Sequence, residues 1–371
     1  MLKANRRIFL LSALGATSLR IQAAEPLQFA HIAPTSGPMA KDSADIRLGL
    51  SAGFAEFAKK NKRSLVLKSA NEEDGPNGLG RRLESLCKQA PTVLLAPVGP
   101  VAIGQLLGSG VLERNDALLI NPLPGAEPFR KPPHPRVLHV RASDTDQVAK
   151  IIQHANTIGI RRLALITEKD ESPAAESIRA TAMAVAAEIG TIEVRHISVP
   201  TPPEAPGAIK KSQFSPQAVL AAGAPPFMAV ALDLVRQLSP GMHTYALSYL
   251  TPDLAVQILG DKARGIGIAQ VYPNLSKTYL PLIKSFREAM SLVAPSSTTL
   301  NALHVEGYVV ARLVTLAAES PKGSTPAGIA TALREAGRIN MSGFEVNFSN
   351  SNEGSRYVEM GVIDGSGSLR G

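Results

Sequence analysis

The segment that most constrains the fold is residues 138–167, LHVRASDTDQVAKIIQHANTIGIRRLALIT. An apolar run ends at Val140, Asp144 is suited to an N-cap with Gln147 three residues later, and Gly159 precedes the next apolar run. Between them, apolar residues recur at helical spacing: Val148, Ile151, Ile152 and Ala155. The segment predicts a strand, a capped helix and a second strand that pairs parallel to the first, a βαβ unit.

The same alternation runs along the chain on both sides of this segment. Strands are expected at Leu27–Ala33, Leu65–Ser69, Val93–Val98, Leu118–Asn121, Leu138–Val140, Leu163–Ile166, Ile192–Val199, Ala218–Ala222, Thr244–Ser248 and Ile266–Val271. Helices are expected at Asp45–Lys60, Leu79–Gln89, Ile103–Glu113, Lys277–Leu292, Leu300–Glu319 and Pro326–Ala336. This pattern predicts an α/β protein with doubly wound parallel sheets, and the length favours two domains. The tail from Gly343 to Asp364 is expected to form two strands around a polar turn.

The first residues have the composition of an export signal. Lys3, Arg6 and Arg7 precede an apolar stretch, Ile8–Leu19, and small residues follow at Ala23 and Ala24. The stretch is shorter than the ~20 residues that a spanning helix needs, so we expect cleavage near Ala24 rather than a membrane anchor. The Sec route is favoured over the twin-arginine route, which the arginine pair leaves open.

Much of the basic charge belongs to this signal. Its removal takes away four basic residues and no acid, so the formal charge falls from +8 to +4. No basic run with interleaved aromatic residues remains, which argues against nucleic-acid binding. The single cysteine, Cys87, cannot form an internal disulfide and is expected to pack as a small apolar side chain. No cysteine follows the signal, so we expect no lipid anchor and a soluble mature chain.

Five motifs in order resemble one family. They are Ser36–Ala40, Asn121–Arg130, the segment 138–167, Leu303–Val314 and Gly354–Gly367. Together they resemble the periplasmic substrate-binding proteins of branched-chain amino-acid-type ABC transporters, which are type I periplasmic binding proteins. The resemblance implies two lobes joined by three crossover strands, near Arg141, Tyr272 and Ile339, with a ligand in the cleft. Lobe 1 would comprise residues 25–141 and 273–338, and lobe 2 residues 142–272 and 339–371.

The resemblance also implies a set of ligand-binding residues at the carboxyl ends of the strands, where open α/β sheets collect ligands. In relatives the first lobe holds a carboxylate with hydroxyls and backbone N–H groups, and the second holds an ammonium with acids and a tyrosine. Ser36, Gly37, Gly99 and Asp146 match that pattern. Five candidates depart from it: Val101, Ala102, Pro124, Asp144 and Tyr249. Tyr272 is a further candidate at a strand end.

The departures remove polar groups. Pro100, Val101 and Ala102 offer no hydroxyl where relatives have one, and Pro124 replaces another hydroxyl-bearing residue. A buried carboxylate without partners is not bound. We therefore expect a ligand that is more apolar or differently charged than a branched-chain amino acid, or a site that has lost its ligand.

Structural roles remain open for several of these residues. Asp144 and Asp146 could be only an N-cap and a first-turn acid, and Ser36 could only shape a turn with Gly37. Tyr249 and Tyr272 could be core aromatic residues with satisfied hydroxyls. His304 and Glu306 are two residues apart, which places them on different faces of a helix, so they are interpreted as structural residues or as a contact between the lobes.

Catalysis has one motif in its favour, G-x-S-x-G at Gly49–Gly53, the pattern of a hydrolase nucleophile elbow. Ser51 lies inside a helical pattern instead of a strand-to-helix turn, so we expect no enzyme activity from it. Histidine and cysteine spacings give no metal site, and Gly265 and Gly267 run into a strand, so no metal or dinucleotide cofactor is expected.

The sequence thus predicts an exported, non-enzymatic binding protein. As the resemblance implies, it would capture a small amino-acid-like or organic-acid ligand in the periplasm by hinge closure and deliver it to an inner-membrane ABC permease with its ATPase. A ligand sensor or accessory interaction protein on the same scaffold, with an altered or decayed ligand site, is the alternative.

Overall fold

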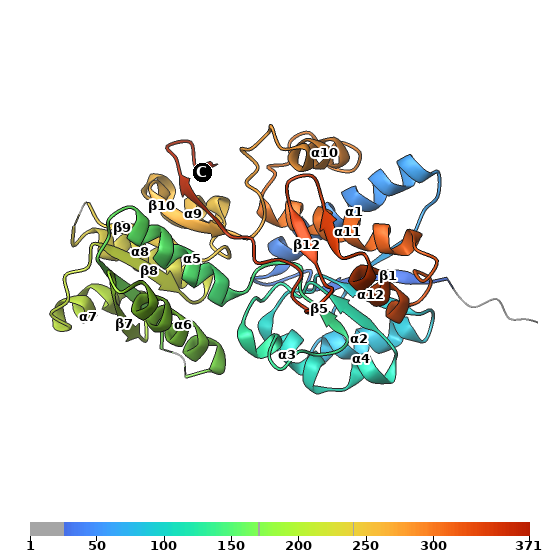
Figure 1. The fold of residues 1–371 in the computed structure, drawn as a ribbon, viewed down its shortest axis with the longest axis horizontal. Coiled ribbons are helices and arrows are strands. Elements are labelled where there is room, and N and C mark those ends of the chain that lie inside the picture. The colour runs from blue at the N-terminus through green and yellow to red at the C-terminus, as the bar shows by residue number, and fades with distance from the viewer. Residues whose placement is uncertain (1–25, 170, 240) are drawn as a thin grey trace, which may run out of the picture.

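The chain forms two α/β lobes that lie side by side (Figure 1). The structure is a computed structural model that describes residues 26–169, 171–239 and 241–371. The predicted export signal, residues 1–24, therefore lies outside the described residues. Both lobes are built on a sheet with helices on its two faces, which confirms the predicted fold class.

The first lobe contains a five-stranded parallel sheet in the order β2-β1-β3-β4-β5. Its strands are β1 (Gln28–Ala33), β2 (Val66–Asn71), β3 (Thr92–Leu95), β4 (Leu118–Ile120) and β5 (Val137–Leu138). One face packs on α1 (Ala40–Asn61), α10 (Pro281–Met290), α11 (Ala302–Glu319), α12 (Pro326–Glu335) and the ribbon β11 (Arg338–Asn340) with β12 (Glu345–Asn347). The other face packs on α2 (Gly78–Cys87), α3 (Pro100–Gly108) and α4 (Val111–Arg114).

The second lobe contains a seven-stranded sheet in the order β14-β13-β10-β9-β8-β6-β7. Its parallel strands are β6 (Arg162–Glu168), β7 (Glu193–Val199), β8 (Ala218–Ala222), β9 (His243–Ala246) and β10 (Ile266–Gln270). Two antiparallel strands, β13 (Glu359–Ile363) and β14 (Leu369–Arg370), complete one edge. The helices are α5 (Asp144–Thr157), α6 (Pro173–Ile189), α7 (Ala205–Lys211), α8 (Pro225–Arg236) and α9 (Pro252–Leu259), with the short 3-10 turns η2 (Pro202–Glu204) and η3 (Gly260–Ala263). A further 3-10 turn, η1 (Glu127–Phe129), lies between β4 and β5 of the first lobe.

The segment 138–167 has the predicted elements but not the predicted pairing. The strand β5 pairs with β4 in the first sheet, whereas β6 pairs with β7 and β8 in the second. The chain therefore passes between the lobes ahead of α5, whose buried residues pack in the second-lobe core, and the prediction of a paired βαβ unit was wrong. Local pattern identifies a strand, but the sheet that it joins depends on distant residues.

The third crossing also lies later than expected. Ile339, Val346 and Phe348 pack in the first-lobe core, and the backbone beside Glu353 bridges to His139. In this part of the chain only β13 and β14 join the second sheet, so the chain crosses between residues 348 and 359 instead of near Ile339. The two strands of the tail do not pair with each other, because β12 pairs with β11 and β13 with β10. The remaining crossings fall at the expected places, after β5 and after β10.

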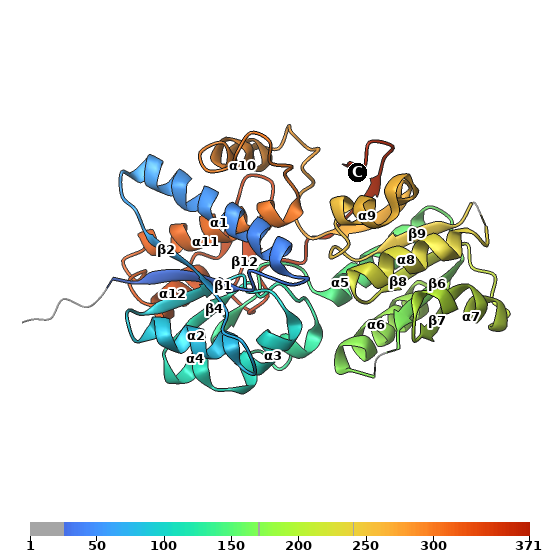
Figure 2. The ribbon, with the colours of Figure 1, turned by 180° about the vertical axis from the view of Figure 1, so that it is seen from behind.

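Two long helices of the first lobe, α1 and α11, cross in close contact (Figure 2). A Cβ atom added at Gly49 would lie 2.1 Å from the backbone oxygen of His304, and one at Gly53 would lie 2.5 Å from the Cβ of Ala311. The reverse holds at Gly307, where a Cβ would lie 2.2 Å from the Ile46 oxygen. The glycines of the G-x-S-x-G motif thus permit helix packing.

Ser51, the serine of this motif, lies within α1 and donates a hydrogen bond to the Arg47 carbonyl oxygen at 2.9 Å. This bond back to the preceding turn is typical of helical serines. The strand-to-helix turn that a nucleophile elbow requires is not formed at Ser51.

Replacement of Gly49 by alanine tests this packing. We expect Gly49→Ala to lower the free energy of unfolding by about 2 kcal/mol or more, because backbone atoms must move apart. Gly104→Ala is the matched control, because Gly104 lies on the exposed side of α3 and an added Cβ would be 3.6 Å from its nearest neighbour. This variant should raise the free energy of unfolding by roughly 0.5–1 kcal/mol. Urea unfolding of both variants measures the difference, and equal stability of the two would refute tight α1–α11 packing.

Candidate functional site

The two lobes enclose a small cavity at the carboxyl ends of their strands. Its volume is about 20 Å³, which is room for about one water molecule. Residues of both lobes and of the crossings line it: Asp42, Leu123, Arg141, Ser248, Tyr249, Thr251, Gln270, Val271, Tyr272, Ala302, Leu303 and Glu306. We call this the cleft cavity.

A buried ion pair forms one wall of the cleft cavity. Nη1 of Arg141, at the first crossing, lies 3.3 Å from Oε2 of Glu306 on α11, and both side chains are 2% exposed. The Arg141 Nη2 also donates to Ser248 Oγ of the second lobe at 2.6 Å. Asn121 donates to Glu306 Oε1 at 2.7 Å and accepts from the backbone N–H of Arg141 at 3.0 Å. The pair thus ties the first crossing to both lobes.

Burial acts on both charges of this pair. Desolvation raises the pKa of Glu306 above its ordinary value, although the Arg141 guanidinium opposes that rise. For Arg141, burial is the largest influence and disfavours the charge, but Glu306 together with Tyr249, Tyr272 and Asp144 outweighs it and raises the pKa of the guanidinium. Arg141 therefore remains a cation in the cleft wall.

A second contact between the lobes is made by Tyr249. Its hydroxyl accepts the backbone N–H of Gly125, in the first lobe, at 2.6 Å and donates to Asp144 Oδ1 at 2.6 Å. Burial and the neighbouring Asp144 raise the pKa of Tyr249, so the hydroxyl keeps its proton. A Cβ at Gly125 would lie 2.6 Å from Asp144 Oδ1, so only glycine permits this approach. The Tyr249 hydroxyl is thus the hydrogen-bond acceptor for the Gly125 N–H of the first lobe.

A third contact between the lobes is ionic. Lys41 of α1 lies 2.8 Å from Asp253 at the start of α9 and 2.7 Å from Asp45. Asp42, beside it, faces the cleft cavity, and burial together with the Asp45 carboxylate raises the pKa of Asp42 to about 6. The rim of the cleft is therefore acidic apart from Lys41.

The structure separates the predicted ligand-binding residues into two groups. Tyr249 and Tyr272 line the cleft cavity, and Asp144 lies directly behind Tyr249. Asp146 has a structural partner: its carboxylate accepts from the Ser143 backbone N–H at 3.0 Å and from the Ser143 hydroxyl at 2.7 Å, which completes a capping box. Ser143, not Asp144, is the N-cap of α5, and the N-cap prediction for Asp144 was wrong.

The other predicted residues do not line the cleft cavity. Ser36 and Gly37 are exposed in the loop after β1, and Gly99 is the N-cap of α3 with φ of 91°. Val101 is 72% exposed. Ala102 and Pro124 are half-buried and lie outside the lining.

Sequence reasoning did not select Asp42, Arg141 or Glu306 as ligand-binding residues. Arg141 was noted only as a crossing, and Glu306 only as a structural residue or a contact between lobes. The usable signal was a charged residue inside an otherwise apolar run, at Arg141 and again at Glu306, because buried charges need a partner.

Two negative findings concern the described part of the chain. Within residues 26–169, 171–239 and 241–371, no helix is long and apolar enough to cross a membrane. In the same residues no group of three or more potential metal-ligating side chains comes together.

The buried pair gives a prediction for stability. Arg141→Met should lower the free energy of unfolding by roughly 3–5 kcal/mol, because it leaves the Glu306 carboxylate buried without its cation. The double variant Arg141→Met/Glu306→Leu should lose less unfolding free energy than the single variant, since no charge remains unpaired. Chemical denaturation of both variants and of Glu306→Leu completes the double-mutant cycle. Additive losses would show that the two side chains do not interact.

Asp42 gives a prediction for pH dependence. Because its pKa is about 6 in the folded state and 3.8 ordinarily, the folded protein binds this proton more tightly, and stability is lost as the pH rises through 6. Asp42→Asn should therefore be more stable than the parent at pH 7.5 by roughly 1–2 kcal/mol, with no such gain below pH ~4. Melting temperatures across this range measure the effect. The exposed Asp74→Asn serves as control, and a gain independent of pH would contradict the shift.

The chain is similar to several proteins of known structure. It is similar over 94% of its length to the whole of an extracellular ligand-binding receptor from Verminephrobacter eiseniae, at 30% identity and a TM-score of 0.83. A substrate-binding periplasmic protein from Ralstonia solanacearum is 23% identical, with 93% of this chain and 99% of that chain covered and a TM-score of 0.77. An ABC transporter solute-binding protein from R. palustris in complex with 4-hydroxybenzoate is 15% identical, with 93% and 95% covered and a TM-score of 0.74.

No curated protein matches the sequence. The sequence pattern that defines periplasmic binding proteins matches residues 26–366, nearly the whole chain. The chain therefore belongs to the periplasmic binding protein family.

Proposed function

We propose that the chain is the periplasmic solute-binding component of an ABC importer and captures a small organic acid between its lobes. The observation that carries this proposal is the cleft cavity, where polar groups of both lobes converge around the Arg141 cation. A pocket of this kind at strand carboxyl ends is the default ligand site of an α/β protein. An inner-membrane permease with its ATPase would be the partner, and we propose no catalytic role.

Ligand entry requires the lobes to part, because the cleft cavity holds about one water molecule. Parting breaks the Lys41–Asp253 ion pair and the hydrogen bond from Gly125 to Tyr249. A ligand favours closure only if its own contacts are stronger in the closed state. A carboxylate that accepts the Gly125 N–H in place of the Tyr249 hydroxyl would satisfy this condition.

The groups around the cleft favour an organic acid over a branched-chain amino acid. Asp144, the acid nearest to Tyr249, already accepts from that hydroxyl and from Gln147 at 3.4 Å. An α-ammonium group would have to displace them. Val101 and Ala102 supply no hydroxyl for an amino-acid carboxylate, as the sequence suggested.

A second function is favoured by the same contacts between the lobes. The Lys41–Asp253 ion pair and the hydrogen bonds from Gly125 to Tyr249 and from Arg141 to Ser248 hold the lobes together across a cavity too small for an amino acid. A protein that closes without a ligand could serve as a sensor or accessory interaction protein, presenting its closed face to a receptor.

Isothermal titration calorimetry of the mature protein tests the proposed function. We expect small carboxylates without an α-ammonium group to bind, and leucine, isoleucine and valine to bind at least about tenfold more weakly, as one lost charged contact predicts. Tighter binding of leucine than of any simple carboxylate would contradict the ligand class. Absence of binding across both groups would favour the accessory role.

The variant Ala302→Trp tests whether the ligand binds in the cleft. Ala302 lies on the rim of the cleft cavity at the start of α11, so a bulky side chain there should block closure and weaken cleft binding by about tenfold or more. Ala187→Trp, on the exposed side of α6, is the matched control. Equal affinities of the two variants would remove the cleft as the ligand site.

A further inference from the structure

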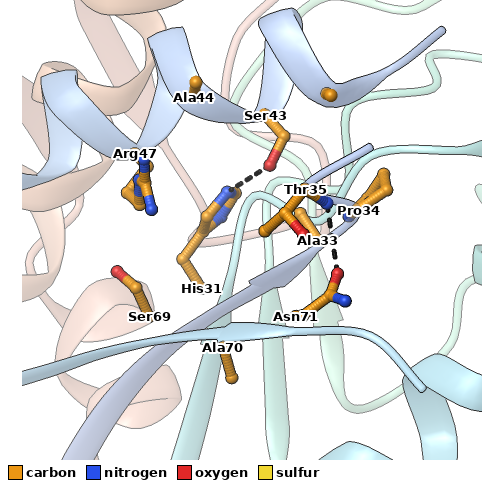
Figure 3. Close-up of a pocket in the computed structure, with 11 residues that line it drawn as sticks. His31, Ala33, Pro34, Thr35, Ser43, Ala44, Arg47, Ser69, Ala70 and Asn71 are labelled. Atoms are coloured by element: carbon orange, nitrogen blue, oxygen red, sulfur yellow. Dashed lines mark hydrogen bonds between the residues drawn. The ribbon is translucent and has the colours of Figure 1, made fainter. Parts of the chain in front are cut away.

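A larger cavity lies inside the first lobe, away from the cleft. Its volume is about 200 Å³, and it lies between β1, the edge strand β2 and the first half of α1 (Figure 3). Its lining residues are His31, Ala33, Pro34, Thr35, Ala40, Ser43, Ala44, Arg47, Ser69, Ala70 and Asn71. None of them lines the cleft cavity, so the two are separate sites. We call this second space the α1 cavity.

The floor of the α1 cavity is formed by His31, which is 2% exposed. Its Nδ1 lies 3.0 Å from the Leu95 carbonyl oxygen, which can only accept, so Nδ1 carries the proton. Burial lowers the pKa of His31, and the ring is neutral. Nε2 is therefore an acceptor that faces Ser43 Oγ at 3.5 Å, a weak bond that a better donor could replace (Figure 3).

The mouth of the α1 cavity carries a cation. Arg47 is exposed, and no carboxylate of the described residues lies within ion-pair distance of it. The lining contains no acid. Ser69 lies below Arg47 in Figure 3 and is exposed on the edge strand, so its hydroxyl and the guanidinium line the same cavity. An anion at the mouth would meet a positive charge without competition from an internal partner.

The size and the walls of the α1 cavity restrict the rest of the ligand. Alanines 33, 40, 44 and 70 supply small apolar walls. An apolar cavity of about 150 Å³ holds a benzene molecule, so about 200 Å³ suits a single ring with one or two substituents.

We propose that the α1 cavity is a second ligand site, which binds a benzoate-sized carboxylic acid with its carboxylate at Arg47 and Ser69 and its ring against the alanines. A hydroxyl on the ring would reach the acceptor at His31. The site stands apart from the cleft and does not depend on the transport function proposed above.

Calorimetry with benzoate, 3-hydroxybenzoate and the neutral isostere benzamide tests the site in the mature protein. We expect both acids to bind and benzamide to bind about tenfold more weakly, because it lacks the charge for Arg47. Arg47→Gln should weaken benzoate to the level of benzamide, whereas Arg63→Gln, a charge change at an exposed arginine elsewhere, should have no effect.

Variants that fill space separate this site from the cleft. Ser69→Phe should abolish benzoate binding, because the ring occupies the mouth, while Ser64→Phe, also exposed, should not. Ala302→Trp, which blocks the cleft, should leave one benzoate site intact. Unchanged benzoate affinity in both Ser69→Phe and Arg47→Gln, or no benzoate binding to the parent protein, would overturn the proposal. Loss of benzoate binding in Ala302→Trp alone would assign benzoate to the cleft and refute the α1 site.

Discussion

The arrangement of the lobes depends on the buried ion pair between Arg141 and Glu306. Arg141 lies where the chain first leaves the lobe 1 sheet, and Glu306 lies on the helix that packs against α1. Two charges that are 2% exposed cannot be left unpaired without a large cost, so the first crossing has one favourable position relative to α11. The additional bonds to Asn121 and Ser248 extend this constraint to both sheets. Both members of the ion pair line the cleft cavity.

The fold class followed from the sequence because it depends on local pattern. Alternating apolar runs predicted most of the strands, and the strand β8 has the expected bounds, Ala218–Ala222. Sheet membership is a different matter. The apolar residues of β5 suit a strand in either sheet, and its pairing with β4 arises from contacts that no window of residues contains. Contacts between distant residues also explain the late third crossing, since Val346 and Phe348 pack in the first-lobe core.

The candidate site was less predictable than the fold. The family pattern directed attention to loops after β1 and β3, where Ser36 is exposed and Val101 is 72% exposed. The groups that face the cleft cavity come from the crossings, from α1 and α11, and from the loops after β4 and β9, so of the predicted residues Tyr249 and Tyr272 lie there. A carboxylate such as Glu306 in a helix gives no sequence signal for the partner that it will meet at the first crossing. Asp146 shows the converse case, because its acid matches a ligand position but is used for capping Ser143.

Helix α1 links these features, since different faces of the same helix meet three surroundings. Gly49 and Gly53 lie against α11, and a side chain there would collide with its backbone or with Ala311. Lys41 reaches Asp253 across the cleft, while Ser43 lies over the α1 cavity. Lys41 and Ser43 belong to the first turn of α1, so the contact between the lobes and the wall of the α1 cavity share one helical turn.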